Sequence, residues 1–409
     1  MSQQPHSHGP EPALFVGIDW STTTHVACAL APDGSRRGRL KFSHSAEGFA
    51  RLLDWLLELC GERSRIAVAI EDPHHPLVDW LLDHGIQTFA INPKQLEHFR
   101  GRYSVANTKD DNRDAYVLGD TLRSDRPRFT PLSLPDPAQL AIREASRLYD
   151  TLQEDFNRAS NRLYSHLLRS APNLLALCHG ANEPFFFELL QLAPTAEAAR
   201  LLRPARIAAL LKKHDKRKFK AHDLLAVLRA PRLALAPGAQ EAIGQTIQTT
   251  LPILIVTWEQ MTAAHKRLAD LVEAGGRTAE IIDSFPGAAE VVTGTLLAEA
   301  PHALATLNLE QLRAVVGSAP VTVRSGKTVT VRMRRACNRR LRDAAFHWAH
   351  NAARRDPLAK AHYQQLRAKG HGHARALRGV VDRLLARLIA ALASDTLYQP
   401  PTPKQASAA

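Results

Sequence analysis

The chain of 409 residues has few cysteines and no long apolar segment. Cys28, Cys60, Cys178 and Cys337 lie far apart, and no CxxC motif or Cys/His spacing typical of a zinc site occurs. This usage fits a reducing, cytoplasmic setting. No apolar run reaches transmembrane length, and the polar start MSQQPHSHGPEP lacks the apolar core of a signal peptide. We therefore expect a cytoplasmic protein that does not enter a membrane.

Acidic residues are scarce relative to basic ones. The chain has 53 Lys and Arg against 40 Asp and Glu, a net charge of +13. Between Val321 and Arg383 there are sixteen Lys and Arg against three Asp and Glu, so this segment alone carries an excess as large as that of the whole chain. Solvated helix faces explain scattered charges, but such a concentration favours a surface that binds nucleic acid.

The first part of the chain alternates between strand and helix patterns. Residues 1–12 and 398–409 are polar or proline-rich, and we expect them to be disordered. Apolar runs predict strands at 13–19, 25–31, 37–43, 65–70 and 86–91, and spaced apolar residues predict helices at 46–60, 75–84, 93–103 and 110–124. Residues 13–128 are therefore predicted to form an α/β domain with a mixed sheet.

Long helices dominate the middle of the chain. Residues 129–277 are predicted to contain a proline-rich linker, a helix at 137–170, a helical insertion at 171–250 and a second long helix at 253–275. The second helix has apolar or aromatic residues at heptad spacing: Leu254, Trp258, Met261, His265, Leu268 and Val272. The two long helices are predicted to pair as a coiled coil, within or between chains. The basic run at 212–220 fits both a solvated loop and a phosphate contact.

Residues 278–397 are predicted to form a mainly α-helical C-terminal domain. The turn at Pro286 and Gly287 fits half of a helix-hairpin-helix, in which backbone N–H groups approach a phosphate, and fits an ordinary helix connection equally well. The alternating segment VTVRSGKTVTVRM predicts a β-hairpin with Arg324-Ser325-Gly326-Lys327 at its tip. Helices at 337–355 and 373–393 are expected to follow.

Four carboxylates are placed to share one site. Asp19 and Glu71 each end a buried strand, and strand ends of an α/β sheet gather at one edge. Asp111 and Asp114 are three residues apart and share a helix face. Four neighbouring carboxylates repel unless cations neutralise them, and Mg²⁺ or Mn²⁺ suits oxygen ligands. Two such ions, roughly 4 Å apart, can clamp the attacking and leaving oxygens of a phosphodiester displacement.

Each of these acids also fits a surface or capping role. Asp111 fits a helix N-terminus, where the helix dipole favours a negative charge. Asp72 and Asp110 are neighbours that could replace the predicted ligands. Ser325 by itself is typical of a turn, because Ser-Gly is common there.

The order of motifs resembles a known family. Asp19 after Gly-Ile, Glu71 after Val-Ala-Ile and the Asp111-x-x-Asp114-Ala motif resemble a RuvC-type, RNase H-like nuclease domain. The C-terminal segments SFPGAAEVVTGTLLAE, GSAPVTVRSGKT, RRACNRRLRDA and DPLAKAHYQQLRAKGHGHARALRGVVDRLL resemble bacterial insertion-sequence transposases of the IS-one-ten group. The likeness is weak over residues 130–275. One departure is the absence of the glycine expected immediately before Asn338.

The resemblance implies roles for particular residues. It implies a DEDD metal site for Mg²⁺ or Mn²⁺ made of Asp19, Glu71, Asp111 and Asp114, and a nucleophilic serine at Ser325, with Ser318 as the competitor. It also implies double-stranded DNA as donor and target, a structured bridge RNA as guide, and a homo-oligomer, dimer to tetramer, with composite active sites. Basic residues near the serine are expected to bind nucleic acid: Arg324, Lys327, Arg332, Arg334, Arg335, Arg339 and Arg340.

The function that the resemblance favours is an RNA-guided DNA recombinase, or transposase, that cuts and rejoins strands through a serine phosphodiester. The sequence has no GxxxxGK[ST] P-loop, in agreement with a reaction that conserves bond energy without ATP. The alternative is a metal-dependent, RuvC-like nuclease or junction resolvase that uses water as nucleophile. A binding protein without activity is disfavoured because all four acids are present.

Overall fold

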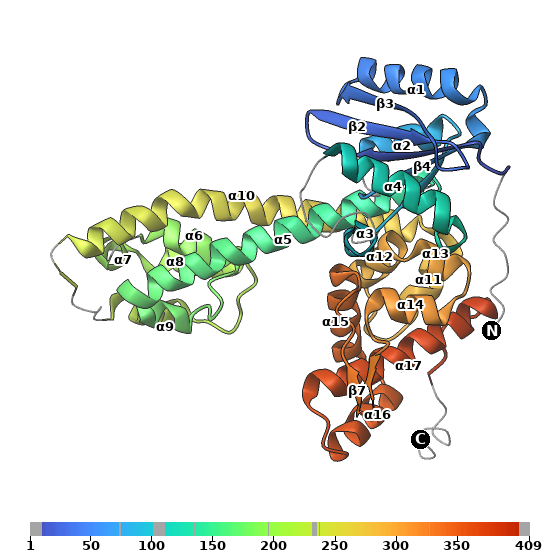
Figure 1. The fold of residues 1–409 in the computed structure, drawn as a ribbon. Helices are drawn as coiled ribbons and strands as arrows, with labels where there is room; N and C mark the ends of the chain where they lie inside the picture. Colours follow the sequence, from blue (N-terminus) through green and yellow to red (C-terminus); the bar gives the residue numbers. More distant parts are fainter. Residues whose placement is uncertain are drawn as a thin grey trace. The chain divides into compact units, whose positions relative to one another are not determined.

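The structure is a computed structural model that describes residues 10–72, 75–100, 111–134, 136–194, 196–230, 235–236, 238–326 and 328–400. The chain divides into two compact units, Met1–Pro135 and Asp136–Ala409 (Figure 1). Within the described residues, no helix is both long and apolar enough to cross a membrane.

The first unit is built on a mixed sheet of five strands in the order β3-β2-β1-β4-β5. The strands are β1 (Leu14–Asp19), β2 (Thr24–Leu30), β3 (Arg36–Ser43), β4 (Ile66–Ile70) and β5 (Gln87–Ala90). β1, β2 and β3 form an antiparallel meander, and β4 pairs in parallel with both β1 and β5. This sheet confirms the predicted mixed α/β architecture.

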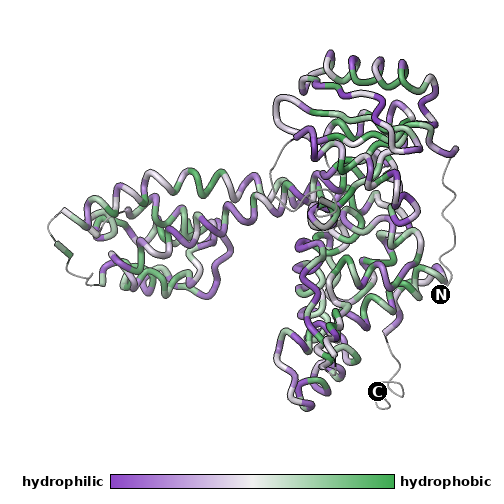
Figure 2. The backbone as a smooth tube through the Cα atoms, in the orientation of Figure 1, coloured by the Kyte–Doolittle hydropathy of each residue, from purple (hydrophilic) through white to green (hydrophobic). Residues whose placement is uncertain are grey.

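Helices cover both faces of this sheet (Figure 1). They are α1 (Ala46–Cys60), α2 (Pro76–Asp83), α3 (Pro93–Arg100) and α4 (Asp111–Asp125). Alternate residues of β1 divide between two cores: Val16 and Ile18 pack with the leucines of α1 and α2, whereas Phe15 belongs to the core with α3 and α4. Figure 2 shows the apolar strands between helices whose outer faces are hydrophilic. The predicted strands and helices of this part are thereby confirmed, and residues 101–110 lie outside the described part.

The proline-rich segment after α4 is tied to the sheet edge. Pro131 forms an isolated antiparallel bridge with Phe89 of β5, and the Leu132 N–H donates to the Thr88 carbonyl at 2.8 Å. The predicted linker is therefore partly held by backbone pairing to the sheet.

The second unit contains two long helices and a set of shorter ones. Its elements up to the second long helix are α5 (Pro137–Ser170), α6 (Pro184–Leu192), α7 (Ala196–Leu201), α8 (Pro204–Lys213), α9 (Ala221–Arg229) and α10 (Ala239–Glu273). α5 and α10 pack along each other, and α6 to α9 complete a core with their distal halves (Figure 1). The predicted helix pair is therefore formed within one chain. The heptad stripe of the second long helix is largely confirmed, since Leu254, Leu268 and Val272 are buried.

α10 begins well before the predicted residue 253. It starts at Ala239 and continues through Pro252 without a break. A proline inside a helix loses one backbone hydrogen bond and costs about 3 kcal/mol. The burial of Ile243, Ile247 and Leu251 on the same helix offsets this cost, because each large apolar side chain contributes about 1.5–3 kcal/mol.

The C-terminal part is helical with one exposed hairpin. Its elements are α11 (Gly276–Asp283), α12 (Glu290–Glu299), α13 (Pro301–Ala305), α14 (Leu309–Val316), β6 (Val321–Ser325), β7 (Thr328–Arg332), α15 (Arg339–Arg355), α16 (Pro357–Ala368) and α17 (His373–Ala393). The predicted hairpin and the helices α15 and α17 are confirmed, whereas α16 was not predicted. Asp356 begins α16 by accepting a hydrogen bond from the Ala359 N–H at 2.8 Å.

Another helix of the protein fills the space in front of the turn at Gly287. Gly287 has φ +82°, and a Cβ there would lie 2.8 Å from the Ala352 backbone nitrogen of α15. Because α15 takes up the space in front of this glycine, the turn is built for helix packing. Of the two interpretations of the sequence, the ordinary connection therefore fits the structure better.

Candidate active site

Asp19 and Glu71 lie side by side at the carboxyl ends of two neighbouring strands. β1 and β4 pair in parallel with Ile18 opposite Ile70, so the next residues in register are Asp19 and Glu71. Neighbouring strands lie about 4.8 Å apart. Both side chains continue the alternation that directs Phe15 of β1 and Ala69 of β4 toward α4. The two carboxylates therefore belong to the same face of the sheet and are half-buried.

α4 brings its first turn to this face. Asp114 is only 4% exposed and lies one turn before the buried Leu118, whereas Asp111, one turn earlier still, is exposed. Residues at these spacings share one side of a helix. The four predicted ligands are thus placed on one side of the sheet, by two strand ends and one helix start. Of the neighbouring acids, Asp72 is half-buried and Asp110 lies outside the described residues.

A glycine permits this close approach of helix and strand. A Cβ on Gly17 would lie 2.0 Å from the Ala115 carbonyl oxygen and 2.3 Å from the Gly119 nitrogen of α4. No larger residue fits between the two backbones. Since Gly17 precedes Asp19 by two residues and Ala115 follows Asp114, the contact fixes the helix start next to the strand end.

The donor set of this site suits a hard divalent cation. The four acids come from three elements on one side of the sheet, but in the described residues their oxygens do not form a cluster within 4.8 Å of one another. Carboxylate oxygens are the ligands that Mg²⁺ and Mn²⁺ prefer, and a bound cation would neutralise their like charges.

Ser325 lies in the second unit at the tip of the hairpin. It ends β6, pairs with Thr328 of β7 and is exposed. The loop between them has two residues, Gly326 with φ +55° and Lys327, which lies outside the described residues. A positive φ at the first loop position is what two-residue hairpins require. The hydroxyl of Ser325 is therefore presented to solvent on a tight turn.

The competing serine is inside the protein. Ser318 is 8% exposed, and its buried hydroxyl has no hydrogen-bond partner within the described part of the chain. A DNA phosphate could reach Ser318 only if α14 and its surroundings moved. Solvent access therefore favours Ser325 over Ser318 as the candidate nucleophile.

The hairpin is exposed on both faces. Its register places Val321 and Val323 on the face of Ser325, and Val329 and Val331 on the other. All four valines are between 36% and 65% exposed. The alternation in the sequence predicts the strands. It does not reveal that both faces of the hairpin are exposed.

The predicted nucleic-acid contacts fall into two groups. Four arginines are exposed, and they lie along the hairpin and at the start of α15: Arg324, Arg332, Arg335 and Arg339. Arg334 donates to the Ala319 carbonyl at 3.3 Å. Arg340 is turned inward, with Nη2 2.9 Å from Asp150 and Nε 3.4 Å from Glu299. The structure thus gives Arg340 an internal ion-pairing role that its sequence position did not indicate.

Glu299 is the centre of a network that the sequence did not reveal. Its side chain is 5% exposed and accepts hydrogen bonds from Arg147 Nε at 3.0 Å and Asn338 Nδ2 at 2.8 Å. Burial raises the pKa of the Glu299 carboxyl, but the hydrogen bonds and charges of these partners outweigh it, so the net pKa is below its usual value. The network joins α5, α12 and the start of α15, close in sequence to the hairpin. The only sequence signal was the acid that ends the largely apolar segment VVTGTLLAE.

The missing glycine before Asn338 does not disturb the turn. Neither Ala336 nor Cys337 has a positive φ, so this backbone needs no glycine. The side chain of Asn338 accepts from the Leu341 N–H at 3.2 Å and starts α15.

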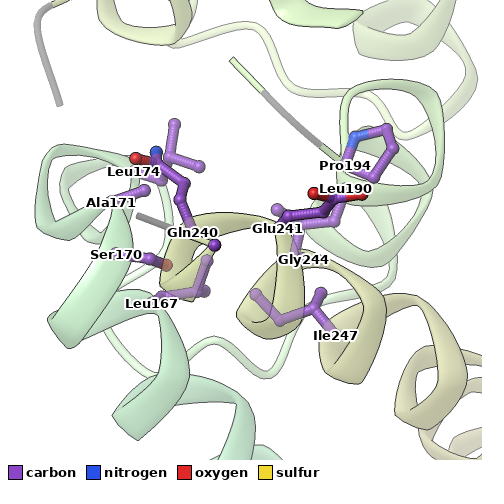
Figure 3. Close-up of a pocket in the computed structure, with 11 residues that line it drawn as sticks. Leu167, Ser170, Ala171, Leu174, Leu190, Pro194, Gln240, Glu241, Gly244 and Ile247 are labelled. Atoms are coloured by element: carbon purple, nitrogen blue, oxygen red, sulfur yellow. The ribbon is translucent and has the colours of Figure 1, made fainter. Parts of the chain in front are cut away.

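A pocket of about 450 Å³ in the helical insertion is separate from these residues (Figure 3). Its lining from α5, α6 and α10 is mainly apolar, with Leu167, Leu190 and Ile247 pointing into it. Glu241 is the one charged residue of the lining, so the pocket has no cluster of charged side chains.

Comparison with known proteins gives matches over both the sheet and the hairpin. A model described as transposase matches residues 16–172, and a model described as transposase IS116/IS110/IS902 family matches residues 279–364. The first match covers the sheet with Asp19, Glu71, Asp111 and Asp114, and the second covers the hairpin with Ser325.

Individual relatives extend the likeness through the middle region. The mini-circle putative transposase for IS117 of Streptomyces coelicolor is 32% identical over 392 residues, which cover 92% of each chain. The insertion element IS110 uncharacterized 43.6 kDa protein of the same species is 22% identical over 94% of this chain and 95% of its own. Putative transposase y4uE of Sinorhizobium fredii is 39% identical over 209 residues, and this chain spans 58% of its length.

These matches confirm the resemblance to the IS-one-ten (IS110) group. The mixed sheet with α4 across one face is the RNase H-like domain that carries the DEDD motif. Such a domain implies a divalent metal, and transposases bind DNA. With two family models in the expected order and a 32% identical relative matched over 92% of its length, the chain belongs to the IS116/IS110/IS902 family of transposases, which are DNA phosphoryl-transfer enzymes.

Proposed function

We propose that this transposase is an RNA-guided recombinase that cuts and rejoins double-stranded DNA through a phosphodiester to Ser325. The observation that supports this most is the exposed serine on the tight turn of a basic hairpin, beside Arg324. The carboxylates Asp19, Glu71, Asp111 and Asp114 form the second half of the proposed site.

The serine step exchanges one phosphodiester bond for another. The Oγ of Ser325 forms a bond to a DNA phosphorus, the bond from that phosphorus to one strand oxygen breaks, and the departing oxygen takes a proton and becomes a hydroxyl end. The serine proton passes to a nearby base. In the second step, which rejoins the DNA, the hydroxyl end of another strand attacks the phosphoserine and releases Ser325. A free hydroxyl is a weak nucleophile, so this step needs activation from the second half of the site.

The carboxylates hold the divalent ions in this proposal. Bound Mg²⁺ or Mn²⁺ supplies charge that polarises the phosphate and favours the ionised nucleophile. Asp114 is buried and fixed by the packing of α4, whereas Asp111 is exposed and accessible to substrate. The exposed arginines Arg324, Arg332 and Arg335 bind the phosphates and balance the charge that develops there.

The proposal includes an oligomer, dimer to tetramer, with composite sites. A two-stranded hairpin is at most marginally stable by itself. Exposed valines on both faces, such as Val323 at 41% and Val331 at 65%, are typical of a surface that becomes covered by a partner. In the oligomer the hairpin of one copy would be held against the carboxylates of another.

Detection of a covalent adduct tests the serine role. The full-length protein with DNA and guide RNA is expected to give an SDS-stable protein–DNA adduct, and Ser325→Ala is expected to abolish it. Ser318→Ala is the matched control, which should retain the adduct because Ser318 is buried. An undiminished adduct with Ser325→Ala would remove Ser325 from this role.

The same assay distinguishes the alternative, a nuclease that uses water. That function is favoured by one observation, since the four carboxylates all lie in a unit that is compact by itself. Cleaved DNA without any adduct, equally efficient in Ser325→Ala, would support it.

The RNA partner is tested by the nucleic acid that co-purifies with the protein. A discrete structured RNA is expected, because target choice by base pairing leaves the protein to recognise RNA shape and backbone. Its binding should weaken steeply with salt, as expected for phosphate contacts. Purification free of RNA from cells that contain the element would contradict the guide.

A further inference from the structure

Three histidines of the first unit surround a common point. His25 is the second residue of β2 and is fully buried, His44 directly follows β3 and is exposed, and His75 directly precedes α2 and is 7% exposed. They come from three segments of the chain, and none of them is among the carboxylates of the proposed site. Their side chains are not used by the proposed reaction.

The centres of the three rings are nearly equally far apart. The ring centres are 5.1 Å apart for His25 and His44, 5.4 Å for His25 and His75, and 5.0 Å for His44 and His75. Zinc binds imidazole nitrogen at about 2.0–2.1 Å, which places the centres of three rings on one tetrahedral ion about 5.2 Å apart. The three separations agree with this value, and no packing rule requires three histidines to be equidistant.

One nitrogen of each ring faces the others. A nitrogen of each histidine lies within 4.8 Å of those of the other two, and His25 Nε2 is 3.0 Å from His44 Nδ1. Two nitrogens on one tetrahedral zinc are about 3.3 Å apart. Ring rotation at the exposed His44 can therefore complete the ligand set.

The same rings form a hydrogen-bonded arrangement without an ion. The Ser21 N–H donates to His25 Nδ1 at 3.2 Å, and the Leu77 N–H donates to His75 Nδ1 at 3.3 Å. Coordination through Nε2 would move each ring proton to Nδ1 and break these bonds. Metal binding would therefore replace these two long hydrogen bonds by metal–nitrogen bonds.

Burial keeps two of these rings neutral. Burial, with the charges of His75 and then His44, lowers the pKa of His25 to about 4. Burial and then His44 lower the pKa of His75, partly offset by Asp72. Neutral imidazoles bind a cation without first releasing a proton. His44 also lines a pocket of about 540 Å³, together with Phe49, Trp80 and His84.

We propose that His25, His44 and His75 bind one transition-metal cation of the zinc type, with an open fourth position. Imidazole nitrogens favour such ions, whereas the carboxylates at Asp19 and Glu71 favour Mg²⁺ or Mn²⁺. The bound ion joins the ends of β2 and β3 to the segment between Glu71 and α2. It therefore stabilises the chain that follows Glu71, and this inference goes beyond the proposed function.

Cobalt binding tests the site directly. Metal-stripped full-length protein carrying His6→Asn and His8→Asn, which removes the tail histidines, is titrated with Co²⁺. One equivalent with the intense visible absorption of tetrahedral Co²⁺ is expected, with displacement by Zn²⁺ but not by excess Mg²⁺. His44→Asn should weaken binding by more than about 100-fold, beyond the effect of losing an outer partner. His44 is exposed, so this variant is expected to fold.

Two control variants keep the result specific. His84→Asn changes a neighbouring histidine that contacts Trp80, and Asp19→Asn changes a carboxylate of the other site. Both should bind Co²⁺ as the parent protein does. Zn²⁺ should raise the melting temperature of the parent protein but not of His44→Asn. Absence of tetrahedral Co²⁺ in the parent protein, or equal binding by His44→Asn, would overturn the proposal.

Discussion

The two halves of the proposed site differ in how the fold holds them. Asp19 and Glu71 end fully buried strands, and α4 packs backbone against backbone on one of them. Ser325 lies on a hairpin whose ten strand residues are all exposed. The carboxylates are therefore prearranged by the core of one unit, whereas the serine is positioned only by its turn. In the proposed function, substrate or a second copy would therefore have to immobilise the hairpin before reaction.

The largest expected effect comes from Asp19→Asn. Removing one charge from the prearranged half should reduce strand cleavage by roughly 100- to 1000-fold or more, as for loss of one electrostatic group at a reacting centre. RNA binding should be nearly unchanged. Cleavage rates and RNA affinity are compared with Asp54→Asn, an exposed acid on α1. Loss of RNA binding in Asp19→Asn would mean that Asp19 maintains the fold instead.

Gly17→Ala tests whether packing prearranges the carboxylates. The added Cβ would meet the Ala115 carbonyl at 2.0 Å, so the variant should lose about 3 kcal/mol of stability in the first unit, together with cleavage. Gly372→Ala is the control, because a Cβ there has nothing within 4 Å. Denaturant unfolding measures both variants, and equal stabilities would contradict close helix–strand packing as the cause.

The Glu299 network tests how the second unit supports its hairpin. Glu299→Ala leaves Arg147 and Arg340 without their shared carboxylate, and should cost about 3 kcal/mol at pH 7. The pKa of Glu299 is lowered in the folded state, so its contribution is present above the unfolded value of 4.5 and is lost as the pH falls through the folded pKa.

Unfolding measured between pH 7 and pH 3 should therefore show a smaller difference between the parent protein and Glu299→Ala at the acid end. Glu144→Ala, an exposed acid on α5, serves as control. A difference that stays constant with pH would exclude the carboxylate charge as the source.

The smallest expected change in stability is that of Val331→Ser. Val331 is 65% exposed, so the substitution should alter unfolding by no more than about 0.5 kcal/mol. It should nevertheless weaken oligomer formation, which sedimentation measures as a function of concentration. A stability loss in the monomer would show that the hairpin packs on its own chain, and the contrast between the two halves would then fail.

The sequence pattern predicted those strands and helices whose apolar spacing was not interrupted by a conflicting signal. The strands from Leu14 to Ile70 and the two long helices were predicted because apolar runs and heptads reflect burial directly. The start of α10 was missed because Pro252 is normally a helix breaker, and its cost is offset by leucine and isoleucine packing that only the folded insertion provides. α16 was not predicted, and it packs through a narrow face, since Ala359 is its one buried residue.

The sequence by itself determined the order of strands and helices, the identity of the candidate carboxylates and serine, and the family to which the chain belongs. These depend on neighbouring residues and on motifs that can be read in order. Tertiary structure decided which residues meet across the chain: Asp19 next to Glu71, Arg340 at Glu299, and three histidines around one point. Such contacts join segments tens to hundreds of residues apart, and their energies arise from packing and burial that no local pattern contains.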